Sequence, residues 1–340
     1  MKFKKIAALS TAVIMSASML VGCGNNKSKE NTDKSFKIGM VADMGGINDE
    51  SFNQSAWEGL QKAEKDFGIE VKVIESKQAS EYLQNMESLL DEDVDMVIGV
   101  GYAMKEDIQK QAENYPDKQF VLIDETYDTI PENVTPILFR ENEAAYLTGL
   151  IAGKMTKTNN VGFIGGIQTP VVSRFEYGYK AGVKEANDKT NVNVQYAGTF
   201  SDAAKGKSIA NQMYGNGSDI ILSAAGGTGL GAIESAKEQN KYAIGVDRDQ
   251  SDLAPENVLT SALKRVNVGV YDTVKEFVEG KLTGGQEKVY GLKEDGVGIP
   301  ETTKNLVPQD IIDYVNSMIE KIKNDEIKVP ATEAELNAYK

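Results

Sequence analysis

The stretch KIGMVADMGGINDESFNQSAWEGL, residues 37–60, joins a short apolar run to an acidic loop and then to a helical pattern. The first six residues have the length and apolarity of a buried strand. After the loop, Trp57, Leu60 and Ala63 recur at helical spacing on one face. A strand followed by a helix begins a β–α–β unit, so the stretch predicts an α/β fold and places Asp43 at the carboxyl end of the first strand.

The same alternation continues along the chain. Helical periodicity fills most of the gaps between short apolar runs. Near-continuous apolar strands that alternate with helices are typical of parallel sheets with helices on both faces. The further runs of strand length are residues 71–75, 95–101, 119–124, 134–139, 160–166, 192–200, 218–226, 242–247 and 258–263.

The chain length and a similarity between two of its segments predict two doubly wound parallel-sheet lobes. From Phe36 to Lys340 the chain has about 305 residues, more than a single core usually holds. The segments KIGMVADMGG and NVGFIGGIQTP begin about 125 residues apart, and each opens a series of strand–helix units. We therefore expect two similar α/β lobes of ordinary domain size.

Residues 1–22 resemble the signal peptide of a bacterial lipoprotein. Three lysines within the first five residues precede an apolar segment, residues 6–20, that is too short to span a membrane. The segment ends in LVGC, residues 20–23, and Cys23 is the only cysteine of the chain. The resemblance implies that Cys23 becomes the N-terminus and carries acyl chains, which together anchor a protein stably.

Residues 23–35 are expected to form the lipidated cysteine and a disordered tether. Residues 24–35, GNNKSKENTDKS, lack any large apolar side chain and therefore have nothing to bury. The predicted location is the extracytoplasmic face of the cell membrane, held by the lipid anchor. The alternative is an ordinary secretory signal with an incidental cysteine.

Charge and composition exclude several classes of function. The formal net charge is −14, and removing the three lysines of the predicted signal moves it to −17. An acidic chain without a basic cluster argues against binding to nucleic acid. Histidine is absent, which excludes imidazole metal sites and Ser-His-Asp catalysis. We expect a binding protein without metal or cofactor, and not an enzyme.

Polar, aromatic and glycine residues collect after the predicted strands. In open parallel sheets, ligands bind beyond the carboxyl ends of the strands. A single aspartate there is more simply a helix cap or turn former. Taken together, these residues predict a site for a ligand with flat apolar faces and hydroxyl edges, and not for an anion, because carboxylates outnumber cations. The residues are Asp43, Phe52, Asn53, Asp124, Gly165, Gly166, Arg174, Phe175, Phe200, Asp202, Gly226, Gly227, Asp247 and Lys264.

Several motifs resemble the basic membrane protein family of substrate-binding lipoproteins. They are DMGGINDESFNQSAWEGL, PVVSRFEYGYKAGV, FSDAAKGK, SAAGGTGLG, IGVDRDQSD and TSALKRVNVGVYD. The resemblance extends over nearly all of residues 36–340. The best-known members of this family are purine nucleoside receptors that serve ABC transporters. The resemblance implies a type I periplasmic-binding-protein fold, with the ligand held between two lobes joined by a three-segment hinge. The N-terminal lobe would comprise residues 36–139 and about 265–300, and the C-terminal lobe residues 140–264 and about 301–340.

The resemblance also implies roles for the residues that would surround the base. Phe52 and Phe200 would sandwich the purine between their rings. Asp43 and Asn53 would bond the edge of the base, and Asp124 would join them.

The remaining roles concern the sugar and the partners. The resemblance implies that Asp247 and Lys264 hold the ribose hydroxyls, that Gly226 contributes backbone, and that Phe175 and Arg174 line the cleft. Closure over the nucleoside would precede recognition by an ABC transporter permease, and the protein is expected to be a monomer. Without histidine, binding is expected to vary little between about pH 5.5 and 8 unless a buried acid has a raised pKa.

Other interpretations remain open. GGTGLG, residues 226–231, could cradle a phosphate, but it lacks the lysine of a P-loop. The acidic loop could bind Ca²⁺ but lacks the EF-hand spacing, and the clustered aspartates of a nucleoside hydrolase are not evident. The main alternative is a binding protein for ribose or another small sugar-like ligand on the same fold. A further alternative is a surface or signalling lipoprotein with a vestigial cleft.

Overall fold

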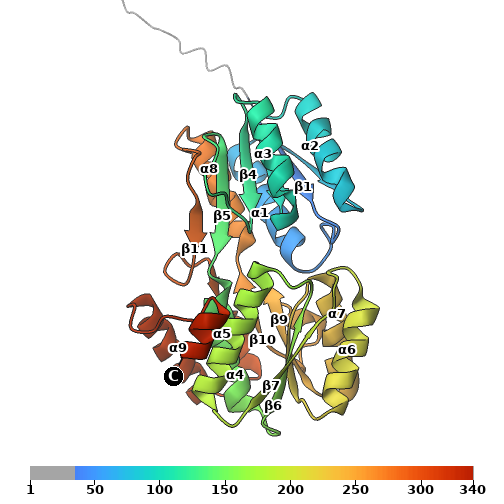
Figure 1. The fold of residues 1–340 in the computed structure, drawn as a ribbon, viewed down its shortest axis with the longest axis vertical. Coiled ribbons are helices and arrows are strands. Elements are labelled where there is room, and N and C mark those ends of the chain that lie inside the picture. The colour runs from blue at the N-terminus through green and yellow to red at the C-terminus, as the bar shows by residue number, and fades with distance from the viewer. Residues whose placement is uncertain (1–34, 340) are drawn as a thin grey trace, which may run out of the picture. The chain divides into compact units, whose positions relative to one another are not determined.

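The computed structural model describes residues 35–339, and these form an α/β fold with two six-stranded sheets (Figure 1). The first sheet has the order β11-β5-β4-β3-β1-β2, and all its neighbouring strands are parallel. Its strands are β1 (Lys37–Ala42), β2 (Glu70–Glu75), β3 (Met96–Val100), β4 (Gln119–Ile123), β5 (Val134–Phe139) and β11 (Lys288–Tyr290).

The second sheet repeats this arrangement, with the order β12-β10-β9-β8-β6-β7. Its strands pair in parallel except at one edge, where β12 is antiparallel to β10. The strands are β6 (Asn160–Gly165), β7 (Asn191–Tyr196), β8 (Ile220–Ala224), β9 (Tyr242–Asp247), β10 (Val258–Lys264) and β12 (Val297–Gly298). The predicted fold class, with two parallel-sheet units, is confirmed.

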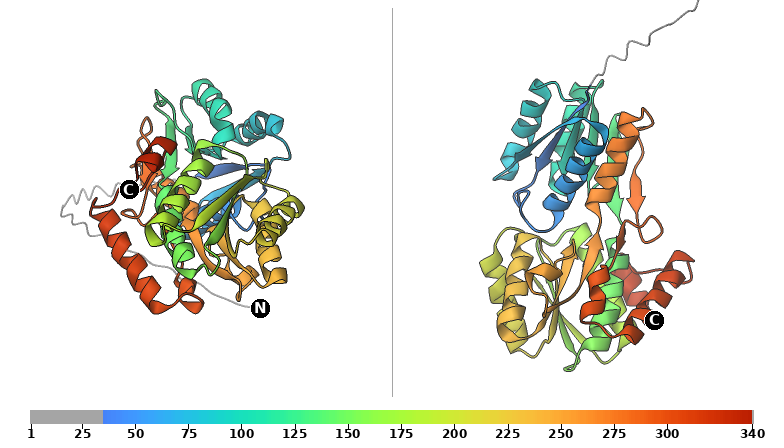
Figure 2. Two further views of the ribbon diagram at one scale, coloured as in Figure 1. Left: turned by 60° about the horizontal axis from the view of Figure 1, so that its bottom comes forward. Right: turned by 180° about the vertical axis from the view of Figure 1, so that it is seen from behind.

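Helices cover both faces of each sheet (Figure 2). On the first sheet, α1 packs with α8 and α2 packs with α3; on the second, α4 packs with α5 and α6 packs with α7. We call the first sheet with α1–α3 and α8 the first lobe, and the second sheet with α4–α7, α9 and α10 the second lobe. The helices are α1 (Phe52–Phe67), α2 (Tyr82–Asp91), α3 (Lys105–Asn114), α4 (Glu141–Met155), α5 (Pro170–Ala186), α6 (Ala203–Gly215), α7 (Gly227–Gln239), α8 (Val266–Val278), α9 (Gln309–Lys323) and α10 (Glu333–Ala338).

The core of the first lobe follows from the alternation of side chains along β1. Successive side chains of a strand point to opposite faces of its sheet. Met40 belongs to the same buried cluster as Leu60 of α1, whereas the next residue, Val41, belongs to the cluster that contains Met86 of α2. Because helices cover both faces of the sheet, nearly every side chain of β1 is buried, and its sequence is therefore a continuous apolar run.

Within residues 35–339 the chain passes between the sheets three times, from β5 to α4, from β10 to α8 and from β11 to β12. None of the helices in this range has the length and apolarity needed to cross a membrane. The predicted signal peptide, Cys23 and nearly all of the predicted tether lie outside the described residues.

Candidate ligand-binding site

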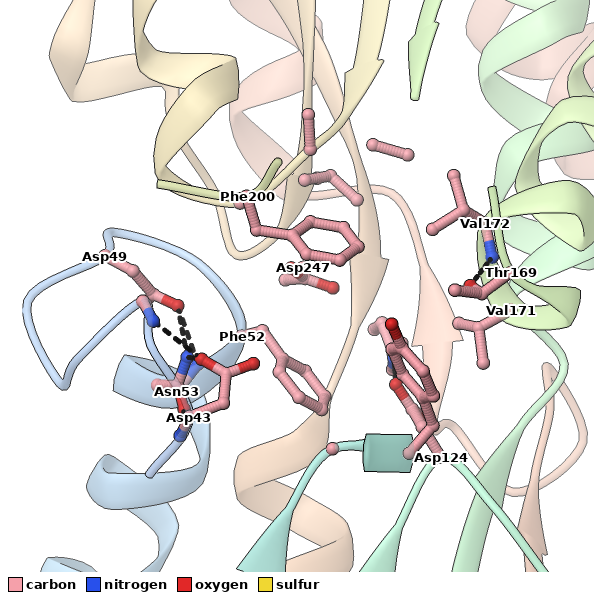
Figure 3. A pocket seen from close by; sticks show the side chains of 18 of the residues that line it. Asp43, Asp49, Phe52, Asn53, Asp124, Thr169, Val171, Val172, Phe200 and Asp247 are labelled. Atoms are coloured by element: carbon pink, nitrogen blue, oxygen red, sulfur yellow. Dashed lines mark hydrogen bonds and ion pairs between the residues drawn. The ribbon is translucent and has the colours of Figure 1, made fainter. Parts of the chain in front are cut away.

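A cavity lies where strand ends of the two sheets come together (Figure 3). About 650 Å³ of space free of protein atoms lies within it, part of it open to solvent. Both lobes contribute to its wall. Of the fourteen residues collected from the predicted strand ends, nine line this cavity: Asp43, Phe52, Asn53, Asp124, Phe175, Phe200, Gly226, Asp247 and Lys264. The other five, Gly165, Gly166, Arg174, Asp202 and Gly227, are not among its lining residues.

The loop after β1 is organised by Asn53. Its Nδ2 donates to Asp43 Oδ1 at 2.7 Å and to Asp49 Oδ2 at 3.0 Å, and its Oδ1 accepts from the backbone N–H of Asp43 at 3.0 Å. Both of its side-chain N–H groups are therefore used within the loop. In the structure Asn53 orients two carboxylates of the cavity wall, and a direct bond from Asn53 to a base remains a prediction.

Asp49 caps the helix that carries Phe52. Its carboxylate accepts from the backbone N–H groups of Ser51, Asn53 and Gln54 at 2.9, 2.9 and 3.1 Å. These are donors of the first turn of α1 that lack partners within the helix. Because the carboxylate of Asp49 accepts these N–H groups, the hydroxyl of Ser51 is available to donate to Asp247 of the second lobe.

Aromatic side chains enter the cavity from both lobes. Phe52 stands in the first turn of α1, whereas Phe200 follows β7 and Phe175 lies on α5. Gly166 makes room for Phe200, because a Cβ atom at this position would lie 2.2 Å from Phe200 Cε1. Figure 3 shows Phe52 and Phe200 reaching into the cavity from different segments of the chain.

Lys264 is the one cationic side chain among the described residues that line the cavity. It is 2% exposed and donates a hydrogen bond to Asp124. Burial by itself lowers the pKa of Lys264, but the charges of Asp124, Asp247 and Glu141 outweigh burial and hold it above the usual value. Lys264 therefore stays charged.

The two aspartates that face Lys264, Asp124 and Asp247, have unusual backbone conformations. Asp124 and Asp247 have φ angles of 72° and 63°, in the left-handed region that non-glycine residues seldom adopt. Oδ1 of Asp124 is buried and, within residues 35–339, has no hydrogen-bond partner. A buried acceptor without a partner is costly, and a ligand that supplies a donor would relieve that cost.

Burial alters the acidity of the site. It raises the pKa of Asp247 to about 6, reinforced by the charges of Asp49 and Asp124 and opposed by Lys264 and Ser51. Burial likewise raises the pKa of Asp43 above its usual value. Four carboxylates and one ammonium group surround the cavity, so the arrangement is suited to a ligand that donates hydrogen bonds and carries no negative charge.

Some wall residues were not predicted from the sequence. The rule that polar residues after strands line the site would also have selected Gly101 and Tyr102, which follow β3 directly. Asp49 lies in the quoted loop but was not among the predicted site residues. The apolar wall residues could not be distinguished in the sequence from residues of the core. These additional wall residues are Gly45, Asp49, Gly101, Tyr102, Thr169, Val171, Val172, Ala224, Ala225 and Val246.

The prediction that Arg174 lines the cleft is wrong. Its Nε donates to Glu141 at 2.7 Å, and Arg174 lines a separate hollow with Arg140 and Lys293. The first turns of α5 present Val171 and Phe175 to the cavity. A step of one residue turns the side-chain direction by about 100° on a helix, which carries Arg174 away from that face.

Among residues 35–339, no group of three or more acidic, histidine or cysteine side chains is arranged to hold a metal ion. The chemistry of the wall is that of hydrogen bonding and ring contact.

The chain is similar over most of its length to several known proteins. The chain is 39% identical to the CD4+ T-cell-stimulating antigen of Listeria monocytogenes, over 96% of this chain and 99% of that protein. It is 38% identical to the ABC transporter nucleoside-binding protein BmpA of Lactococcus lactis, over 87% of this chain and 91% of that protein. The crystal structure of an ABC transporter solute-binding protein from Aeropyrum pernix superposes with a TM-score of 0.81 at 27% identity, over 89% of this chain and 96% of that one.

These likenesses confirm the resemblance inferred from the motifs and the type I periplasmic-binding-protein-like fold. They also place the chain among proteins that bind substrates and are not enzymes. Residues 36–333 match the family model, and the chain belongs to the Bmp family of PnrA-like ABC transporter substrate-binding proteins.

Proposed function

We propose that the chain captures nucleosides, with purine nucleosides as its main ligands, in the cavity between the lobes and delivers them to an ABC transporter for uptake. Cys23 would carry the lipid anchor that holds the protein at the extracytoplasmic face of the membrane. The name of the lactococcal relative supports nucleosides as the ligand class.

The observation that carries the proposal is the combination of two phenylalanine rings from different lobes with carboxylates around them. Phe52 and Phe200 offer apolar faces to a planar base, and ring stacking contributes about 0.5–1.5 kcal/mol beyond area burial. Asp247 and Asp124 offer acceptors for hydroxyl and N–H groups, and hydrogen bonds to charged groups contribute roughly 1.5–3 kcal/mol each. A nucleoside has both a planar base and donor-rich edges.

Capture requires that the lobes separate and close. The three passages of the chain between the sheets would form the hinge, with residues 36–139 and about 265–300 moving against residues 140–264 and about 301–340. In the open form, ligand would reach the strand ends. Closure would bring Phe52 and Phe200 onto its two sides and remove it from water.

A free sugar such as ribose is the second candidate. The carboxylates of the cavity would suit its vicinal hydroxyls as well as those of a nucleoside. The aromatic walls distinguish the two, because a free pentose has no planar base to fill the space between the rings.

A thermal-unfolding screen tests the proposal. A ligand that binds only the folded state at one hundred times its Kd stabilises a protein by about 2.7 kcal/mol, which is visible as a raised Tm. We expect adenosine, guanosine or inosine to raise Tm, and ribose and free phosphate to leave it unchanged. A response to ribose without a response to any nucleoside would favour the second candidate.

A further inference from the structure

Two short segments of opposite lobes are joined just outside the cavity. Arg248 Nη1 lies 2.7 Å from Glu50 Oε2, and Arg248 Nη2 lies 2.8 Å from Glu58 Oε1. Gln250 Nε2 donates to the backbone carbonyl of Glu50 at 2.8 Å. Ser51 completes the junction through its hydrogen bond to Asp247.

The second-lobe side of this junction is preorganised. Gln250 is 4% exposed, and its Oε1 accepts from the backbone N–H of Val246 at 3.0 Å. Its own backbone N–H donates to Ser261 Oγ at 3.1 Å. The side chain of Gln250 is therefore bonded to β9 and its backbone to β10, while its amide Nε2 donates to Glu50 of the other lobe.

The first-lobe side is held in a strained conformation. Glu50 has a φ of 52°, again in the left-handed region, and this turn presents both its carboxylate and its carbonyl to the second lobe. Strain of this kind persists where surrounding contacts hold it in place. Here Arg248 and Gln250 supply contacts from the second lobe, and Gln54 of the first lobe accepts from the backbone N–H of Glu50 at 3.2 Å.

We propose that Arg248 and Gln250 form a clasp that holds the lobes closed and so sets how long a bound ligand is retained, without touching it. This rests on the proposed function, in which the cavity between the lobes holds a ligand. Among the described residues that line the cavity, Arg248, Gln250, Glu50 and Glu58 do not appear. Three of them lie close to wall residues in the sequence: Arg248 and Gln250 follow Asp247, and Glu50 stands two residues before Phe52.

The clasp can favour the closed form because its contacts are made between the lobes. A ligand shifts an equilibrium between open and closed forms only through interactions that differ between them, and the same holds for residues of the protein. The clasp bonds join the two lobes, so separation breaks them together. A single exposed ion pair contributes little. Arg248, however, has a side chain that is only 25% exposed and pairs with two carboxylates through separate nitrogens, so the three charges form a small network rather than an isolated pair.

The test compares Arg248→Met with Lys207→Met. Lys207 also bridges two glutamates, Glu234 and Glu238, with a similarly covered side chain, but all three lie in the second lobe. Stopped-flow kinetics would use inosine as the probe. We expect Arg248→Met to raise the dissociation rate constant about tenfold and to change the association rate constant less than twofold, since affinity changes at an interface lie mostly in dissociation. Lys207→Met should change neither.

A second readout does not depend on the ligand. In the chain with Cys23→Ser, fluorophores attached to Glu64→Cys and Lys237→Cys, both exposed positions on different lobes, report the distance between the lobes. Without ligand, Arg248→Met should shift the distances toward larger values, and the exchange Arg248→Glu with Glu58→Arg should restore part of the shift.

The two proposals fail in different ways. If inosine does not bind the parent chain, the proposed function is wrong for this probe, and the distance measurement still decides on the clasp. Dissociation rates and distances that are the same in Arg248→Met as in the parent chain would overturn the clasp.

Discussion

Nζ of Lys264 lies 4.5 Å from the centre of the Phe52 ring while it donates a hydrogen bond to Asp124. Lys264 ends a strand of the second sheet, whereas Phe52 and Asp124 belong to the first lobe. One ammonium group therefore contacts an aromatic wall and a carboxylate of the opposite lobe. Lys264 offsets part of the negative charge of the cavity wall, and its contacts with Phe52 and Asp124 exist only while the two lobes are together.

Removing that ammonium group should destabilise the protein. In Lys264→Met, Asp124 remains buried without its cation, and breaking a buried ion pair on one side costs roughly 3–5 kcal/mol. Urea unfolding at pH 7 measures the loss. The double variant Lys264→Met with Asp124→Asn should recover most of it, because no uncompensated charge remains at this pair. Losses that simply add in the double variant would show that the two groups do not stabilise each other.

The cavity assignment predicts a loss of affinity in two variants. Phe52→Ala removes a ring wall and Asp247→Ala removes an acceptor, and each should weaken binding of a purine nucleoside at least about tenfold, or about 1.4 kcal/mol. Phe67→Ala is the control, since Phe67 ends the same helix but packs on Tyr271. Isothermal titration provides the affinities. Parent-like affinity in both cavity variants would mean that the ligand binds elsewhere.

Gly166 offers a test that leaves every wall side chain chemically intact. Because a Cβ atom there would lie 2.2 Å from Phe200 Cε1, Gly166→Ala must displace the Phe200 ring. We expect nucleoside affinity to fall about tenfold, the order of one lost ring contact. Gly215→Ala is the matched control, because a Cβ at Gly215 meets nothing within 4 Å. Equal affinity in the two variants would count against a stacking role for Phe200.

Much of the site could be predicted because chain order determines position in an α/β fold. Asp43, Asp124 and Asp247 follow strands directly, and strand ends of parallel sheets share one edge. The direction of a helical side chain was harder to predict. Phe175 and Arg174 are neighbours in sequence, yet Phe175 lines the cavity and Arg174 pairs with Glu141.

Neither the short edge strands nor the raised pKa values of the buried acids could be predicted from the sequence. β11 and β12 have three and two residues, too few for any periodicity to show. The absence of histidine predicted binding that varies little with pH unless a buried acid has a raised pKa. Asp247 and Glu141 meet that condition, because burial raises their pKa values to about 6 and about 7. Composition alone does not reveal which acids are buried.

Glu141 should make stability depend on pH. It is fully buried at the start of α4, and burial raises its pKa to about 7, with Asp124 acting in the same direction and Arg174 and Lys264 opposing. Between the unfolded value, about 4.3, and the folded one, the native state binds the extra proton, so the free energy of unfolding falls as pH rises. Urea unfolding should show a smaller fall from pH 5 to pH 7.5 in Glu141→Gln than in the parent chain.

The pKa of Asp247 is also raised, and Asp247 remains in Glu141→Gln. Part of the fall in the free energy of unfolding should therefore persist in that variant. An identical fall in the parent chain and in Glu141→Gln would show that Glu141 does not titrate in this range.

The most direct test of the central claim is calorimetric titration of the chain, refolded to remove any carried-over ligand, with adenosine, guanosine, inosine, cytidine, uridine and ribose. We expect tight binding of at least one purine nucleoside, with one ligand per chain, and no heat with ribose. Binding of ribose together with silence from every nucleoside would contradict it.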